Sequence, residues 1–132
     1  MSSTQTLFEK ACAVRNNAYA PYSNFLVGTC LETEDGETFV GCNVENASYG
    51  LCVCSESNAI AAMVAAGKRK IKQAVVVVAG PEISTCCGAC RQRLNEFGSA
   101  ETLLHFATPG GIKQSYRLAE LLPYAFGPGD LA

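Results

Sequence analysis

The stretch Ile71-Lys72-Gln73-Ala74-Val75-Val76-Val77-Val78-Ala79 decides the fold class. Its four consecutive valines favour a strand that is buried on both faces, because a half-buried strand would alternate apolar and polar residues. A strand of this kind needs other elements to cover each face of its sheet. The elements on either side of it therefore determine the architecture.

Upstream of this strand, the sequence predicts a helix over 54–66, rich in alanine and ended by Gly67. A hairpin precedes it, with strands over 25–31 and 38–44 and an Asp35-Gly36 turn. An N-terminal helix over 4–19 carries apolar residues at helical spacing and ends before Pro21.

Downstream, the sequence predicts a helix over 87–97, a strand over 103–107, a turn over 108–111 and a short helix over 118–122. The resulting order is αββαβαβ, with room for one further strand. We therefore expect an α/β fold in which a mixed β-sheet is sandwiched by helices.

The composition predicts one domain over residues 1–132, since 48% of the chain is hydrophobic and only 17% is charged. The net charge of -2 and the lack of an extended basic patch argue against nucleic acid as a partner. The N-terminus has no secretory pattern, and no apolar stretch is long enough to span a membrane. We therefore expect no membrane partner and a cytoplasmic location.

The chain has eight cysteines, which in a reducing compartment are metal ligands or buried thiols rather than disulfides. Core packing accounts for Cys12, Cys30 and Cys42. Cys52 and Cys86 flank the remaining cysteines, and their role stays open.

The other three cysteines, Cys54, Cys87 and Cys90, lie at predicted helix starts. Unpaired N–H groups there favour anions, so that thiolates form easily. The spacing of Cys87 and Cys90 puts both on one side of a turn, where two facing helix starts can hold one zinc ion with an open position for water. Glu56, in the first turn after Cys54, can then move protons without binding the metal.

Two other classes of function compete with this interpretation. A Cys-x-x-Cys pair also occurs in thiol oxidoreductases and in structural zinc modules. A redox function leaves Cys54 and Glu56 unexplained, and a structural zinc site normally has a fourth protein ligand. The one histidine, His105, lies far along the chain in a predicted strand.

Zinc deaminases combine a ligand-x-Glu segment with a later Cys-x-x-Cys. Five segments of the sequence together carry a further signal: Tyr19-Ala20-Pro21-Tyr22-Ser23-Asn24-Phe25, Gly41-Cys42-Asn43-Val44-Glu45-Asn46-Ala47-Ser48-Tyr49-Gly50, Cys54-Ser55-Glu56, Cys87-Gly88-Ala89-Cys90-Arg91-Gln92 and Glu120-Leu121-Leu122-Pro123-Tyr124-Ala125-Phe126. Through these segments, which span nearly the whole chain in the family's order, the chain resembles the small cytidine deaminases of the tetrameric three-cysteine type.

The resemblance implies one Zn²⁺ per chain on Cys54, Cys87 and Cys90, with Glu56 as the proton shuttle. It implies hydrolytic deamination of cytidine and deoxycytidine with release of ammonia. A modified pyrimidine nucleoside or another aminated heterocycle is the alternative substrate.

The resemblance also implies the substrate contacts. Asn43 and Glu45 would bind the ribose hydroxyls, since an amide and a carboxylate together offer donors and acceptors. Phe25 would pack on the pyrimidine ring, and Ser55 would line the substrate site. The implied assembly is a homotetramer in which Phe126 closes a neighbouring subunit's site, and the apolar C-terminal segment fits such burial.

Two positions depart from the family. Cys86 stands where proline is common before the Cys-x-x-Cys, and Ser57 stands where arginine is common after the catalytic glutamate. Three thiolates leave a zinc site with a formal charge of about -1. Without an arginine at position 57, Arg91 or helix N–H groups are the candidates to balance this charge.

Overall fold

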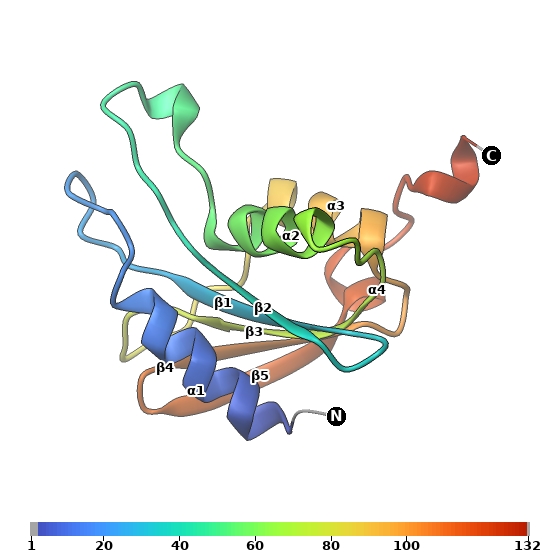
Figure 1. Ribbon diagram of the computed structural model, residues 1–132, viewed down its shortest axis with the longest axis horizontal. Coiled ribbons are helices and arrows are strands. Elements are labelled where there is room, and N and C mark those ends of the chain that lie inside the picture. Colours follow the sequence, from blue (N-terminus) through green and yellow to red (C-terminus); the bar gives the residue numbers. More distant parts are fainter. Residues whose placement is uncertain (1–2, 132) are drawn as a thin grey trace.

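The computed structural model describes residues 3–131 (Figure 1). Met1, Ser2 and Ala132, the ends of the predicted domain, lie outside the described residues. One mixed sheet has the strand order β2-β1-β3-β4-β5, in which β3 and β4 are parallel and the other neighbours are antiparallel. The strands are β1 (Gly28–Thr33), β2 (Thr38–Cys42), β3 (Ile71–Val77), β4 (Leu103–Thr108) and β5 (Gly111–Arg117).

Helices cover both faces of the sheet, as predicted (Figure 1). Helix α1 (Thr4–Arg15) packs on one face, while α2 (Ser55–Ala65), α3 (Gly88–Phe97) and α4 (Leu118–Leu121) lie on the other. Two short 3-10 helices, η1 (Tyr49–Leu51) and η2 (Pro128–Asp130), complete the elements. Across residues 3–131, no helix is long and apolar enough to cross a membrane.

Strand β3 is buried on both faces, as its valine run predicts. Val75 and Val77 point to the α1 side, where they pack with Leu7, Ala11 and Cys30. Ala74, Val76 and Val78 point to the opposite side, into the larger core under α2 and α3. The placement of Cys30 in the core confirms its predicted packing role, and Cys12 packs at the margin of the same cluster.

Two predicted boundaries are wrong near the N-terminus. Helix α1 ends at Arg15 instead of residue 19, because Tyr19 pairs with the backbone of residues 43–45. Strand β1 starts at Gly28 instead of Phe25. The Asn43 side chain accepts a hydrogen bond from the Val27 N–H and donates one to the Phe25 carbonyl, each at 2.8 Å, and so holds residues 25–27 outside the ladder.

The return strand also ends early, at Cys42, because Val44 leaves the sheet and pairs with Val53. The expected further strand is β5, a largely exposed edge strand joined to β4 by a Pro109-Gly110 turn. Because most residues of β5 are polar, its sequence shows little of the apolar–polar alternation that predicts a strand.

A glycine lets α2 approach the sheet closely. A side-chain carbon on Gly41 in β2 would lie 2.4 Å from the Ala59 backbone nitrogen and 2.5 Å from the Ser55 carbonyl oxygen. Both atoms belong to the α2 backbone, which cannot move away without shifting the helix. Gly41 therefore determines how deep the first turn of α2 sits.

Candidate active site and metal centre

Three thiols from two helix starts converge on one point. Cys54 is the N-cap residue of α2, Cys87 is the N-cap residue of α3, and Cys90 lies in the first turn of α3. Their Sγ atoms all lie within 4.8 Å of one another. Sulfurs around a tetrahedral zinc at its usual Zn–S distance are about 3.8 Å apart, so this donor set fits zinc with a small contraction.

The three thiols have different electrostatic surroundings. A hydrogen bond from the Cys90 backbone at the start of α3 lowers the pKa of the Cys87 thiol. Burial raises the pKa of both the Cys54 and the Cys90 thiol. A bound cation would favour all three thiolates, because a metal deprotonates the thiols that coordinate it.

Glu56 lies beside the thiols and is only 5% exposed. The Ser55 hydroxyl donates to its Oε1 atom at 2.8 Å, and the Thr29 and Ser55 hydroxyl oxygens are also 2.8 Å apart. Since Ser55 donates to the carboxylate, the Thr29 hydroxyl donates to Ser55. This chain of hydroxyls from β1 to α2 orients the carboxyl group.

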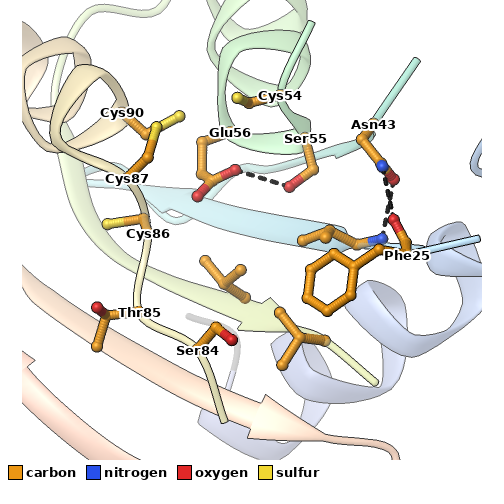
Figure 2. Close-up of a pocket in the computed structure, with 13 residues that line it drawn as sticks. Phe25, Asn43, Cys54, Ser55, Glu56, Ser84, Thr85, Cys86, Cys87 and Cys90 are labelled. Atoms are coloured by element: carbon orange, nitrogen blue, oxygen red, sulfur yellow. Dashed lines mark hydrogen bonds between the residues drawn. The ribbon is translucent and has the colours of Figure 1, made fainter. Parts of the chain in front are cut away.

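The thiols and Glu56 open onto one cavity of about 280 Å³. Figure 2 shows Cys54, Cys87, Cys90 and Glu56 gathered at one side of it, with Phe25 and Asn43 across the cavity. The full lining is Phe25, Val27, Asn43, Cys54, Ser55, Glu56, Val76, Val78, Ser84, Thr85, Cys86, Cys87 and Cys90. The cavity thus lies beside the carboxyl end of β3, where ligands of open α/β sheets are commonly bound.

Asn43 and Phe25 form the wall opposite the thiols (Figure 2). The two Asn43 bonds to the Val27 N–H and the Phe25 carbonyl fix the segment that carries the Phe25 ring. Ser55 also lines this cavity, so four of the six predicted catalytic and substrate-binding side chains share it: Phe25, Asn43, Ser55 and Glu56.

The fifth predicted residue, Glu45, lies in a neighbouring hollow lined also by Tyr22, Ser23, Tyr49 and Cys52. Its carboxylate accepts hydrogen bonds from the N–H groups of Tyr22 and Ser23 at 3.0 and 3.2 Å, and from the Ser23 hydroxyl. The Ser23 hydroxyl bond is the main cause that lowers the pKa of this carboxyl. Glu45 therefore holds the loop over 21–24.

The sixth residue, Phe126, lies outside the cavity, and the residue is 59% exposed. Its carbonyl accepts hydrogen bonds from the side chains of Gln92 and Asn95 of α3 at 2.8 and 3.2 Å. These bonds hold the backbone and leave the ring free. The C-terminal segment projects away from the sheet in Figure 1.

Arg91 was one of the two candidates for balancing the charge of the thiolates. Its guanidinium donates to the carbonyls of Cys86 and Leu121 and to the Thr85 hydroxyl, at 2.9 to 3.0 Å. Arg91 therefore connects α4 to the loop that carries Cys86. These three bonds are not with the thiols of Cys54, Cys87 and Cys90. Cys86 lines the cavity, and burial raises the pKa of its thiol to about 11.

Sequence reasoning missed two residues of this region. Thr29 orients Ser55, but a threonine in a strand carries no signal of such a contact. Arg93 approaches the Cys90 sulfur, with 4.0 Å between Nη1 and Sγ. The spacing of three residues along α3 was the available signal, since residues i and i+3 share a helix face.

The fold and the site define a metal-dependent hydrolase, because three thiols and a carboxyl group face one cavity without a fourth protein ligand among residues 3–131. Residues 1–106 match the family described as "Cytidine and deoxycytidylate deaminase zinc-binding region". The chain belongs to this family.

Relatives match nearly the whole chain. A cytidine deaminase of Halalkalibacterium halodurans is 39% identical over 127 residues, which are 96% of this chain and 96% of the relative. A cytidine deaminase of Mycobacterium tuberculosis is 41% identical over 86% of this chain and 82% of its own length. The crystal structure of cytidine deaminase from Burkholderia pseudomallei matches with a TM-score of 0.89 and 43% identity, covering 95% of this chain and all of that one (100%).

Proposed function

We propose that the chain catalyses the hydrolytic deamination of cytidine and deoxycytidine, giving uridine or deoxyuridine and ammonia. The observation that carries this proposal is the position of the Glu56 carboxyl group, which is buried, oriented by Ser55 and next to three convergent thiols on one cavity. No observation favours a modified pyrimidine, a thiol redox reaction or a non-catalytic zinc module over this reaction.

Cys54, Cys87 and Cys90 are the proposed ligands of one zinc ion per chain. When bound there, zinc supplies Lewis-acid activation of a water molecule, which becomes a nucleophile near neutral pH. Glu56 takes the two protons of the attacking water in turn and passes the first to the pyrimidine ring and the second to the departing amine, a role worth about 10²- to 10⁴-fold in rate. The Ser55 hydroxyl keeps the carboxyl group facing the cavity during these transfers.

The substrate contacts belong to the same proposal. Phe25 packs on the pyrimidine ring, and Ser55 lines the site of the ring. Asn43 and Glu45 bind the ribose hydroxyls. The low pKa of the Glu45 carboxyl supports its part, since an ionised carboxylate accepts hydrogen bonds from hydroxyl groups.

The proposed assembly is a homotetramer with shared active sites. Two segments expose apolar side chains: the arm over 43–53, with Tyr49 74% and Leu51 64% exposed, and the C-terminal segment with Phe126. Apolar surface of this extent favours burial between subunits. Phe126 would then close the cavity of a neighbouring subunit. Its hydrogen-bonded backbone and its exposed side chain support this role.

We also propose that residues 1–132 form one domain that works in the cytoplasm in pyrimidine salvage. The free state of all eight cysteines supports this location, because a reducing compartment preserves thiols.

Ammonia release from a panel of cytidine, deoxycytidine, cytosine and cytidine monophosphate tests the proposed reaction. The two nucleosides should react, and the base without ribose should react poorly. Turnover of cytosine alone would contradict the nucleoside assignment, and no ammonia from any member by zinc-loaded protein would contradict the reaction.

Light scattering on the intact protein and on a Phe126→Ser variant tests the shared site. The variant should lose turnover while its isolated chain stays folded by circular dichroism. A fully active monomer in the intact protein would contradict the shared-site proposal.

A further inference from the structure

The proposed metal centre would carry a net negative charge when its metal is bound. Three thiolates and a divalent cation sum to about -1, in a region where Cys90 is 1% exposed. Buried charge of this kind needs hydrogen-bond donors or a counter-charge close by. Three of the five N–H donors of Arg91 contact the loop and α4, and none of these three contacts is with a sulfur of the cluster.

Arg93 is placed to supply that counter-charge. Among the described residues, it is the one cation whose side chain contacts a sulfur of the cluster, at 4.0 Å from Nη1 to the Cys90 Sγ atom. Both residues lie on one face of α3, because they are three positions apart. A guanidinium is always charged and carries five N–H donors, so it can serve the sulfur and still contact solvent.

The groove between α2 and α3 leaves room for this guanidinium. It has a volume of about 530 Å³ and lies between Ser57 and Ile60 of α2 on one side and Arg93 and Glu96 of α3 on the other. The Ser57 hydroxyl oxygen is buried here and has no hydrogen-bond partner within residues 3–131. A larger side chain at position 57 would occupy the same groove.

We propose that Arg93 is the positioning residue that balances the thiolate charge of the metal centre, acting from α3 across the groove that Ser57 leaves open. It acts through Cys90: its N–H groups draw electron density from the sulfur, so that the bound cation keeps more of its Lewis acidity. The inference rests on the proposed function only for its effect on turnover.

Cobalt substitution tests the role of Arg93 separately from the proposed deamination. In protein loaded with Co²⁺ alone, the sulfur-to-cobalt charge-transfer absorption reports the electron density on the thiolates, whether or not the protein turns over cytidine. Arg93→Gln and Arg93→Met should shift this band to longer wavelength, because sulfur electrons rise in energy when a cationic donor is removed. Arg93→Lys, which keeps the charge but loses the fork of donors, should give a smaller shift.

Turnover gives the second readout. In the zinc enzyme, Arg93→Gln should lower kcat by about 10-fold or more with little change in KM, the size of effect usual for residues that contact metal ligands. The double variant Ser57→Arg/Arg93→Gln should restore both the cobalt band and kcat, because an arginine at position 57 reaches the same groove from α2. Arg69→Gln is the matched control, since the hydrogen bonds of Arg69 within residues 3–131 go to the Val64 and Lys68 carbonyls, and it should leave both readouts unchanged.

An unmoved cobalt band in whichever of Arg93→Gln and Arg93→Met folds by circular dichroism would overturn the inference. A shifted band that the double variant does not reverse would overturn it as well, because Arg93 would then act on the fold of α3 rather than through its charge. If no variant or parent deaminates cytidine, the proposed function fails, while the cobalt spectra still decide the role of Arg93.

Discussion

Each face of the sheet buries a carboxyl group, and the two are held in different ways. On the α1 face, Glu32 is fully buried, at 0% exposure, and accepts a hydrogen bond from the Gln73 amide at 2.9 Å. Gln73 in turn accepts from His105 Nε2 at 3.0 Å, and His105 Nδ1 accepts from the Ser115 hydroxyl at 2.6 Å. This network ties β1, β3, β4 and β5 together.

On the α2 face, Glu56 has one side-chain donor among the described residues, the Ser55 hydroxyl, and it faces a cavity. The same contrast separates the thiols. Burial in β1 raises the pKa of Cys30 to about 11, whereas the start of α3 lowers the pKa of Cys87. Residue type alone therefore does not decide whether a carboxyl or thiol group has a structural or a chemical role. Its hydrogen-bond partners and its access to solvent decide this.

Removal of one thiol from each face should give the largest difference in zinc content and turnover. Cys90→Ala is expected to lose the zinc ion and all measurable turnover, since a site with two protein thiols holds zinc weakly. Cys30→Ala should keep one zinc per chain and lose about 1 kcal/mol of stability from the small cavity. Cys86→Ala should also keep its zinc. Metal analysis of the purified variants checks this, and zinc retained by Cys90→Ala would contradict the ligand assignment.

The two carboxyl groups give the next contrast. Glu56→Gln should retain zinc and fold but lose about 10²- to 10⁴-fold in kcat, because an amide cannot carry the proton. Glu32→Gln should retain kcat and lose about 1–3 kcal/mol of unfolding free energy, because its amide disturbs a buried hydrogen bond. Steady-state kinetics and urea unfolding separate the two effects. Normal turnover in Glu56→Gln would contradict the proton-shuttle role.

Two glycines test how each face positions its helix. Gly28 meets α1 as Gly41 meets α2: a side-chain carbon on Gly28 would lie 2.2 Å from the Ala11 carbonyl oxygen. Gly28→Ala and Gly41→Ala should each cost about 1–3 kcal/mol through forced backbone shifts. Only Gly41→Ala should also lower kcat, because it displaces the start of α2 with Cys54 and Glu56. Equal kcat values in the two variants would show that α2 tolerates displacement.

The smallest expected effect is a pH dependence on the α1 face. Burial lowers the pKa of His105, so the folded protein binds this proton less readily than the unfolded chain does. The contribution of His105 to the unfolding free energy is therefore fully present above the ordinary histidine pKa of about 6.5. It is lost as the pH falls below that value. Between pH 8 and pH 5.5, the unfolding free energy measured with urea should fall less for His105→Asn than for the parent protein. A steeper loss would contradict the sign.

Pattern alone was sufficient for the sheet, its two helical layers and the gathering of the three thiols, since the valine run and the cysteines at helix starts depend on local physics. Pattern failed where segments far apart in the sequence form hydrogen bonds with each other. Asn43 removes residues 25–27 from β1, and Tyr19 shortens α1, through contacts between segments that no periodicity records. The spacing of Arg93 from Cys90 placed both on one face of α3, but the groove beside Ser57 that leaves room for the guanidinium is formed between two helices and leaves no local pattern.

The cysteine positions have a consequence for chain entropy. Cys54 precedes β3 in the chain, whereas Cys87 and Cys90 follow it. A cation shared by these thiols closes a loop that contains all of α2 and the central strand. Loop closure restricts the unfolded ensemble far more than the folded one. A metal ion bound by these thiols would thus cross-link the middle of the chain, and its loss should loosen the α2–β3–α3 segment before it affects α1 or the β4–β5 hairpin.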